Sequence, residues 1–261
     1  MALSPVGEAY DRSARAWRAG PERIYNVLAE HLVARCPVPL RGVVAVDIGA
    51  GTGSVTYALQ RAGARPIAID ISASMLAAIT STPMPAAVAD ATVLPVASKS
   101  VGVVTAGFCL SHLDDPAQAI HEAARVLTPR GALIASAFGD SSNPLKDLVE
   151  EVATSFGYEP PHWYRQLKAA EQTVADTARW KASATAAGFA DATVDVDVVD
   201  VGPLSSDAAI HWRAGMAHLA PFIDALGRGD RDAFFARVRA KTGPGPHQFR
   251  PEVVTLVARA R

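Results

Sequence analysis

The stretch from Val43 to Gly53 runs V-V-A-V-D-I-G-A-G-T-G and decides the fold. Its first four residues form a continuous run of small and β-branched side chains, which predicts a strand buried on both faces. The three glycines at positions 49, 51 and 53 let the backbone turn sharply and approach a ligand closely, which a Cβ would prevent. A buried strand followed by such a turn indicates the first βα unit of a parallel sheet.

The same alternation continues on both sides of this stretch. Short apolar runs predict further strands over residues 66–69, 87–89, 101–107 and 132–137. Helical patterns are expected over 54–62, 72–80, with Ser72 as its cap, and 116–127, and an amphipathic helical region over 11–35. Strands that alternate with helices at this spacing predict an α/β fold, Rossmann-like and doubly wound, around a mostly parallel seven-stranded sheet.

After Phe138 the pattern becomes largely helical, with helices expected over 143–157, 163–188, 205–226 and 230–241 and strands over 192–201 and 251–258. No repeat or second domain boundary is visible, so residues 1–261 are interpreted as one domain. Within it we expect a helical lid over 1–36, a ligand-binding core over 43–138, lid insertions over 139–176 and 203–246, and the rest of the sheet over 177–202 and 247–261.

Composition narrows the classes of partner. The chain has 261 residues with 25 Lys and Arg against 26 Asp and Glu, so it has no surplus of cations for a nucleic-acid backbone or a membrane surface. No apolar run approaches the roughly 18 residues of a membrane span, and the start lacks a secretory signal, which favours a cytoplasmic protein. Its two cysteines are too few for a disulfide framework or a thiolate metal site, and no metal is expected. The composition does not address the oligomeric state.

Three acidic residues follow consecutive predicted strands: Asp47, Asp70 and Asp90. Neither a G-x-G-x-x-G dinucleotide fingerprint, which would need glycine at Ser54, nor a phosphate-binding G-K-[ST] is present. Asp70 lies 70 − 51 = 19 residues after Gly51, near the spacing of about 20 at which an acid accepts hydrogen bonds from ribose hydroxyls. Asp90 can accept from an exocyclic amine. Together the three acids favour an adenosine whose 5′ substituent is cationic.

This constellation resembles the class I S-adenosylmethionine-dependent methyltransferase family, and most of all its small-molecule branch of ubiquinone/menaquinone type. The similar stretches are VVAVDIGAGTG, IAIDISASML, VADATVLPVASKSVGVV, LSHLDDP and HEAARVLTPRGALI. The chain departs from the family pattern at Val101, Gly102 and Arg130, outside the expected pocket. The resemblance implies S-adenosyl-L-methionine as cofactor, bound by Asp47, Gly49, Gly51, Gly53, Asp70, Ile71, Asp90, Ala91 and Phe108.

His112 is the candidate catalytic residue. It follows the fourth strand, where ligands of open α/β sheets bind, and could act as a general base for an acceptor that is still protonated near pH 7. A base with an ordinary histidine pKa would give activity that rises with pH through about 6.5. Alternatively, His112 contacts the cofactor or bonds a loop carbonyl. The family's Asn/Asp-Pro-Pro-aromatic motif is absent, where Ala106 to Cys109 stand, which disfavours a nucleobase as acceptor.

The helical additions are expected to hold the substrate. Candidates that could roof the pocket are Trp17, Trp163, Tyr164, His211, Trp212 and His218. Their apolar and aromatic character favours methyl transfer to a small, partly apolar organic molecule, on oxygen, nitrogen or carbon. One alternative is a non-methylating rearrangement or cyclisation in the same pocket, which only product analysis separates. Another is a non-catalytic binding module, which the intact set of three acids disfavours.

Overall fold

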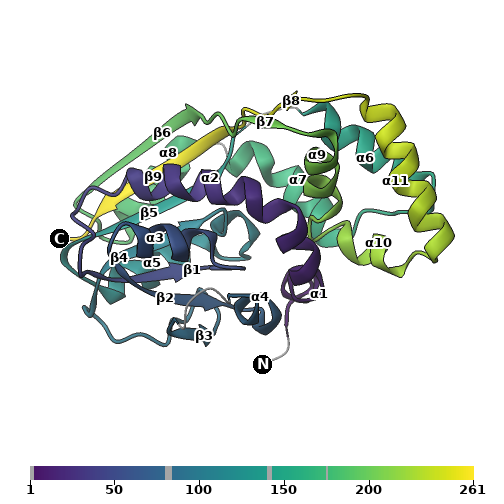
Figure 1. Cartoon of the computed structure of the whole chain (residues 1–261). Coiled ribbons are helices and arrows are strands. Elements are labelled where there is room, and N and C mark those ends of the chain that lie inside the picture. Colours follow the sequence, from purple (N-terminus) through teal and green to yellow (C-terminus); the bar gives the residue numbers. More distant parts are fainter. Residues whose placement is uncertain (1–2, 80–83, 140–142, 175) are drawn as a thin grey trace.

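A single mixed sheet organises the chain (Figure 1), and the computed structural model describes residues 3–79, 84–139, 143–174 and 176–261. Its strands are β1 (Val44–Ile48), β2 (Arg65–Asp70), β3 (Ala86–Val88), β4 (Val101–Gly107), β5 (Leu127–Phe138), β6 (Asp191–Val198) and β9 (Glu252–Arg259). They lie in the order β3-β2-β1-β4-β5-β9-β6, and β9 is antiparallel to both of its neighbours. The predicted seven-stranded, mostly parallel sheet is confirmed.

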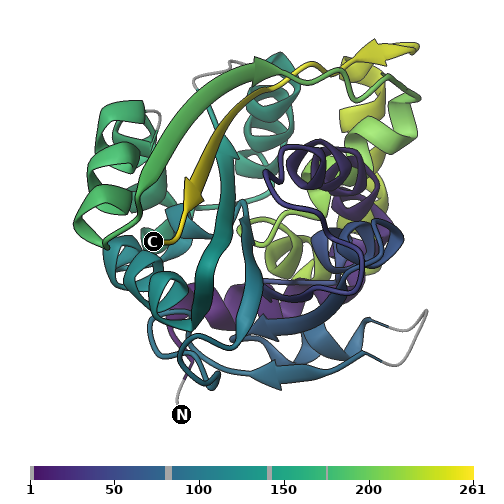
Figure 2. The same cartoon turned by 90° about the vertical axis from the view of Figure 1, so that its left-hand side faces the viewer.

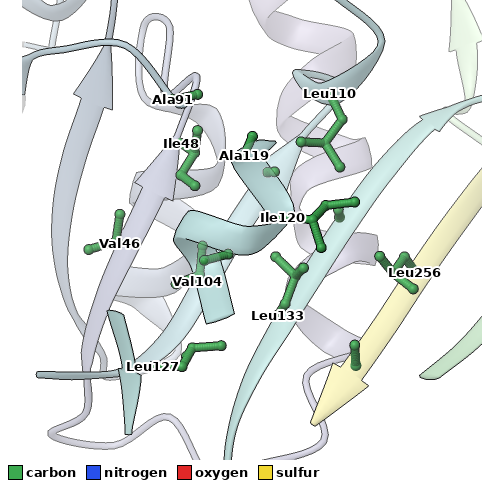
Figure 3. Close-up of a cluster of buried hydrophobic side chains, with 14 of the residues drawn as sticks. Val46, Ile48, Ala91, Val104, Leu110, Ala119, Ile120, Leu127, Leu133 and Leu256 are labelled. Carbon is green, nitrogen blue, oxygen red and sulfur yellow. The ribbon is translucent and has the colours of Figure 1, made fainter. Parts of the chain in front are cut away.

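Helices cover both faces of this sheet, as Figure 2 shows. On one face, α2 (Pro21–Ala34) and α3 (Ser54–Arg61) pack their apolar side chains on Ala45, Val103 and Ile134. On the other face lie α5 (Pro116–Val126) and α8 (Thr177–Ala186). Figure 3 shows Ala119 and Ile120 of α5 against the strand residues Val104 and Leu133, all of them buried. Burial on both faces explains why the central strands are continuous apolar runs.

Caps fix where several of the helices begin. Ser72 accepts a hydrogen bond from Met75 N at 3.0 Å at the start of α4 (Ala73–Ala77), as predicted. Asp115 accepts one from Gln118 N at 2.9 Å before α5, whose first residue is Pro116. Each cap uses an N–H group that has no partner within the helix, so these short sequence signals are sufficient to place the helix starts.

The remaining helices form a lid beyond the carboxyl ends of the parallel strands (Figure 1). They are α1 (Pro5–Ala19), the 3₁₀ helix η1 (Leu110–His112), α6 (Pro144–Thr154), α7 (His162–Val174), α9 (Ser206–Ala214), α10 (Ala220–Ala225) and α11 (Arg228–Thr242). Two short strands, β7 (Pro203–Leu204) and β8 (His247–Gln248), form a separate antiparallel pair. None of the helices in the described part of the chain combines the length and apolar character that crossing a bilayer requires.

Several predicted helical regions have other bounds or are divided in the structure. The helical region expected over 11–35 begins earlier, at Pro5, and consists of two helices, because Pro21 has no N–H to continue α1 past Gly20. The helix expected over 163–188 is α7 and α8, with Asp176 capping the second, and that over 205–226 is α9 and α10. Thr80, the predicted end of the helix over 72–80, and Ala175 lie outside the described residues.

Candidate active site

A cavity of about 710 Å³ lies where β1, β2, β3 and β4 end, with α1 and α7 as its outer walls. Its sheet side is formed by the turns that follow the four strands, namely residues 49–52, 70–71, 89–92 and 107–109. Its lid side is formed by residues of α1, α2, η1 and the first turns of α7. This is the position in which ligands bind to open α/β sheets.

The glycines of the turn after β1 let its backbone lie close to the cavity and to the turn after β4. Gly49 has φ +65°, and a Cβ there would lie 2.5 Å from the Sγ of Cys109, which follows β4. Gly51 has φ +55° and nothing within 4 Å of a built Cβ, so the backbone conformation alone favours glycine there. Its N–H donates to Oδ2 of Asp70 at 2.8 Å, which joins the first turn to the second.

Asp70 and Asp90 both line the cavity with oxygens that can accept from a ligand. Oδ1 of Asp70 accepts from Ser72 N at 2.8 Å, and burial raises the pKa of this carboxyl. Asp90 uses Oδ1 twice, for the N–H of Thr92 at 2.8 Å and its hydroxyl at 2.7 Å. Its Oδ2 is left to accept from a ligand. Ile71 and Ala91 stand beside them in the cavity wall.

Two hydroxyl groups at the start of α3 are buried without a hydrogen-bond partner in the described part of the chain. They are Oγ1 of Thr52 and Oγ of Ser54, and both residues line the cavity. Buried polar groups are normally satisfied, so these two indicate a polar ligand at this end of the cavity. A carboxylate would suit them because the first N–H groups of a helix also favour negative charge.

Asp47 and Gly53 do not line the cavity, although the sequence predicted that they bind the ligand directly. Asp47 is 1% exposed, and its oxygens accept from the hydroxyls of Thr56 at 2.6 Å and Thr105 at 2.7 Å. Burial raises the pKa of this carboxyl to about 6, against the effect of those hydrogen bonds. Asp47 therefore supports the turn from behind, where the hydroxyls of α3 and β4 meet it.

Aromatic rings line the lid side of the cavity. The ring centroids of Tyr10 and Trp17 on α1 are 5.6 Å apart, those of Trp17 and Tyr25 are 4.7 Å apart, and those of Tyr25 and Phe108 are 5.3 Å apart. Trp163, at the start of α7, also contributes to the wall. This end of the cavity suits an apolar or planar molecule, because aromatic rings present large apolar surfaces.

His112 lies in η1 and faces this wall. Its Nε2 is 3.3 Å from the hydroxyl of Tyr10, and the two rings meet edge to face at 83°. Its Nδ1 is buried without a partner in the described part of the chain. Burial lowers the pKa of His112 to about 4, so the imidazole is neutral at pH 7. Burial also raises the pKa of Tyr10 well above its ordinary value, which keeps the phenol protonated.

The predicted roof residues separate into two groups. Trp17 and Trp163 line the cavity, whereas the other four lie outside it. Those four are Tyr164 and His218, which stack on each other, Trp212, which packs on Phe249, and His211, which packs on Phe235. The sequence analysis missed Tyr10 and Tyr25. Tyr10 could have been found, because it lies seven residues before Trp17 and therefore on the same helix face.

Comparison with known proteins places this site in a family. Residues 46–135 match the family model described as a methyltransferase domain. Residues 46–135, called the methyltransferase domain after this match, are thus similar to that family. This domain contains the end of β1, all of β2 to β4 and most of β5, so it carries all the turns of the sheet side of the cavity. The methyltransferase domain implies S-adenosylmethionine as the cofactor.

Two curated proteins show more distant similarity. The chain is 33% identical over 140 residues to the demethylmenaquinone methyltransferase of Mycolicibacterium paratuberculosis, covering 54% of this chain and 59% of that protein. It is 32% identical over 145 residues to the demethylmenaquinone methyltransferase of Clavibacter sepedonicus, covering 54% and 58%. The chain thus matches little more than half the length of these relatives, and the lid lies largely outside the methyltransferase domain.

Solved structures share the fold over more of the chain. Phosphoethanolamine N-methyltransferase 2 of Haemonchus contortus, in complex with phosphomonomethylethanolamine and S-adenosylhomocysteine, has a TM-score of 0.58 at 15% identity, covering 99% of this chain and 60% of that one. The cyclase SpnF has a TM-score of 0.55 at 20% identity, covering 90% and 81%. At these identities the likeness establishes the fold alone.

The residues around the cavity fit the implied cofactor. Asp70 can accept from ribose hydroxyls, and Oδ2 of Asp90 can accept from an adenine amine. The unpaired hydroxyls of Thr52 and Ser54 can donate to the carboxylate of a methionine moiety. The methyltransferase domain therefore offers partners for the ribose hydroxyls, the adenine amine and the carboxylate of S-adenosylmethionine.

Proposed function

We propose that this protein transfers a methyl group from S-adenosylmethionine to a small, partly apolar organic molecule. One observation carries the proposal: the cavity joins the acidic turns of the methyltransferase domain to an aromatic wall built by the lid. The first part suits the cofactor and the second suits the acceptor. The similarity of residues 46–135 to methyltransferases supports the same function.

When bound, S-adenosylmethionine supplies a methyl group that its sulfonium has already activated. The task left to the protein is to hold the acceptor atom in line with that methyl group and to exclude water. Phe108, which lines the cavity and meets the ring of Tyr25 edge to face, is 8% exposed. The lid helices α1 and α7 close the acceptor side.

Tyr10 and His112 form the route by which a proton leaves the acceptor. The acceptor group gives its proton to the oxygen of Tyr10 as the Tyr10 hydroxyl passes its own to Nε2 of His112, across the 3.3 Å between them. The neutral state of His112 at pH 7 supports this role, because a protonated imidazole could not accept. The product is the methylated acceptor, with the proton on the imidazole.

The experiment incubates the protein with S-adenosylmethionine labelled in its methyl group and a panel of small phenols, hydroquinones and amines. We expect label in an organic product and an equal amount of S-adenosylhomocysteine. A product formed without loss of label from the cofactor would instead support a rearrangement or cyclisation in the same pocket. Failure of S-adenosylmethionine to bind at all would overturn the proposed function.

The role of His112 is tested by His112→Ala, with Tyr10→Phe beside it. We expect His112→Ala to transfer methyl groups about 10²- to 10⁴-fold more slowly than the wild type, with unchanged affinity for S-adenosylhomocysteine. Because the pKa of His112 is about 4, wild-type activity should fall on acidification through that pH and not through the value of about 6.5 that the sequence suggested. The variant should lack this dependence, and loss of cofactor affinity in parallel with rate would mean that His112 only supports the cofactor.

A further inference from the structure

The lid helix α7 sets one wall of the acceptor end of the cavity. Pro161, just before it, and His162, Trp163 and Gln166 within it line the cavity. The same helix packs on η1, the element that carries His112. A displacement of α7 would therefore change both the aromatic wall and the surroundings of the proposed proton acceptor.

Little apolar packing holds α7 in this position. Among its residues whose side chains are described, 162–169, only Tyr164 is buried, at 8% exposure. Tyr164 does not line the cavity and contacts Glu150 on α6 and His218, which lies between α9 and α10. Its ring stacks on the imidazole of His218 with the centroids 3.7 Å apart and the planes at 4°. Among residues 162–169, Tyr164 is thus the main buried attachment of α7 to the rest of the lid.

Glu150 on α6 is the polar partner of that side chain. Its Oε1 accepts from the hydroxyl of Tyr164 at 2.9 Å and from the guanidinium of Arg213 on α9 at 2.8 Å. The ammonium of Lys168, also on α7, lies 3.5 Å from Oε2. Three lid helices, α6, α7 and α9, therefore meet at one carboxylate, and Figure 1 shows them together in the lid.

The cluster is a charged one in a buried place. Arg213 is 3% exposed, and Nε2 of His218 lies 3.4 Å both from its guanidinium and from Oε1 of Glu150. Burial alone would raise the pKa of Glu150, but the hydrogen bond with His218 and the charge of Arg213 lower it to about 2. Glu150 is therefore ionised at pH 7, and Tyr164 donates to a full negative charge. Hydrogen bonds of this kind are stronger than bonds between neutral groups.

We propose that Glu150 is a positioning residue that, through Tyr164, holds the first turns of α7 against η1 and so fixes Trp163 at the acceptor end of the cavity. This inference rests on the proposed function for its kinetic consequence. Glu150, Tyr164 and Arg213 then affect binding of the acceptor through the position of α7, without contacting the acceptor. The cofactor end of the cavity does not depend on them.

Tyr164→Phe is the decisive variant. It removes one hydrogen bond and keeps the ring that stacks on His218, whereas Glu150→Gln also deprives a buried guanidinium of its charge partner and is used only after its folding is verified. The control is Glu151→Gln, at the next position of α6, where an exposed carboxylate pairs with Lys241. It makes the same chemical change as Glu150→Gln, on the same helix, and its ion pair is with α11 and not with α7.

Two measurements test the proposal. Amide hydrogen exchange over residues 162–169, followed by mass spectrometry without any acceptor, should be about 10- to 100-fold faster in Tyr164→Phe, the range that loss of a hydrogen bond to a charged group predicts. With the labelled-methyl assay, KM for the acceptor should rise by a similar factor, while kcat changes less and affinity for S-adenosylhomocysteine stays within about twofold. Glu151→Gln should change none of these.

Two outcomes would overturn the positioning proposal, and a third would overturn the proposed function. Unchanged exchange over 162–169 would overturn the proposal, whatever the activity. Faster exchange with an unchanged KM would also overturn it, because the cluster would then stabilise the lid without positioning the acceptor. If wild-type protein transferred no methyl group to any acceptor, the proposed function would fail, and the quenching of Trp163 fluorescence by acrylamide, compared with Trp163→Phe, would still show whether Glu150 positions this side chain.

Discussion

The carboxylate of Asp70 lies between two backbone N–H groups, those of Gly51 and Ser72, and its hydrogen bonds to them fix the second turn against the first. Asp47 also ends a strand, but its oxygens are directed into the sheet, to the hydroxyls of Thr56 and Thr105. Two acids with the same position in the sequence pattern therefore have different roles. The difference is set by their neighbours, which are backbone N–H groups of the turns for Asp70 and two buried threonine hydroxyls for Asp47.

Replacing Asp70 by alanine tests the ligand-facing role. We expect Asp70→Ala to bind S-adenosylhomocysteine about 10- to 100-fold more weakly, because a hydrogen bond to a charged acceptor contributes about 1.5 to 3 kcal/mol. Isothermal titration calorimetry measures the affinity. Asp191→Ala, on the exposed edge strand β6, serves as the control and should bind as the wild type does. If Asp70→Ala bound S-adenosylhomocysteine as tightly as the wild type does, Asp70 would not hold the ribose.

At the scale of the site residues, the sequence predicted most of those at strand ends and only part of those in the lid. Asp70, Asp90 and Gly51 could be found because each stands at or soon after the end of a predicted strand, and all three line the cavity. Tyr10 could not be paired with His112 from the sequence, since 102 residues separate them and only the lid brings them together. The pKa of His112 was likewise set by burial, which no local pattern shows.

Among the elements, α1 shows how a lid helix is attached to the cofactor end of the cavity. Oδ1 of Asp11 accepts from the hydroxyl of Ser72 at 2.7 Å and from the N–H of Ser74 at 2.9 Å. These groups belong to the start of α4, two residues after Asp70. The backbone hydrogen bond from Ser74 is the main cause of the lowered pKa of Asp11. α1, which carries Tyr10 and Trp17, is thereby joined to the turn that is expected to hold the ribose.

Asp11→Ala should loosen this attachment. Loss of a side-chain cap costs about 1 kcal/mol, so we expect S-adenosylhomocysteine to dissociate roughly fivefold faster, as stopped-flow fluorescence can measure. Arg12→Ala is the matched control, because its only ion pair in the described part of the chain is the exposed one with Glu8. Equal dissociation rates in the two variants would show that α1 closes the cavity without help from Asp11.

The ends of the lid helices were predicted less well than those of the core, and for a physical reason. The strand over 101–107 was predicted to the residue, because apolar runs between turns mark buried strands directly. The break between α1 and α2 at Gly20 could have been found from Pro21, which cannot continue a helix. The glycine itself has a distant cause, because its Cα lies so close to the backbone of His211 on α9 that a Cβ would not fit. Local propensity cannot reveal that contact.

For the whole molecule, the two ends of the cavity have different origins. The cofactor end comes from consecutive βα turns within residues 46–135, so it is local in the sequence and matches a family. The acceptor end is assembled from α1, α2 and α7, which are distant from one another along the chain. A family can thus keep one cofactor while its lid changes, and the acceptor of this protein has to be sought in its lid.

The pH dependence of stability depends on all buried groups whose pKa values differ between the folded and the unfolded protein. Burial lowers the pKa of His112 and of His218 to about 4, so both gain a proton on unfolding between about pH 4 and 6.5. The unfolded state then binds more protons, and stability rises with pH across this interval. Asp47 and Asp70 act in the opposite direction, because burial raises their folded pKa values above the unfolded ones, that of Asp47 to about 6. Glu150, whose folded pKa is lowered to about 2, acts with the two histidines. We therefore expect the free energy of unfolding to fall on acidification from pH 6.5 to 4.

Urea unfolding at pH 4, 5 and 7, followed by circular dichroism, measures this fall. A pKa shift of the size found for His218 corresponds to roughly 3 kcal/mol when the interval is crossed completely. His218→Gln should be less stable at pH 7 but lose less stability on acidification, whereas His31→Gln, on a partly exposed histidine of α2, should keep the wild-type slope. Stability that is constant or that increases from pH 6.5 to 4 would contradict this prediction and would mean that the buried carboxyls of Asp47 and Asp70 outweigh the two histidines.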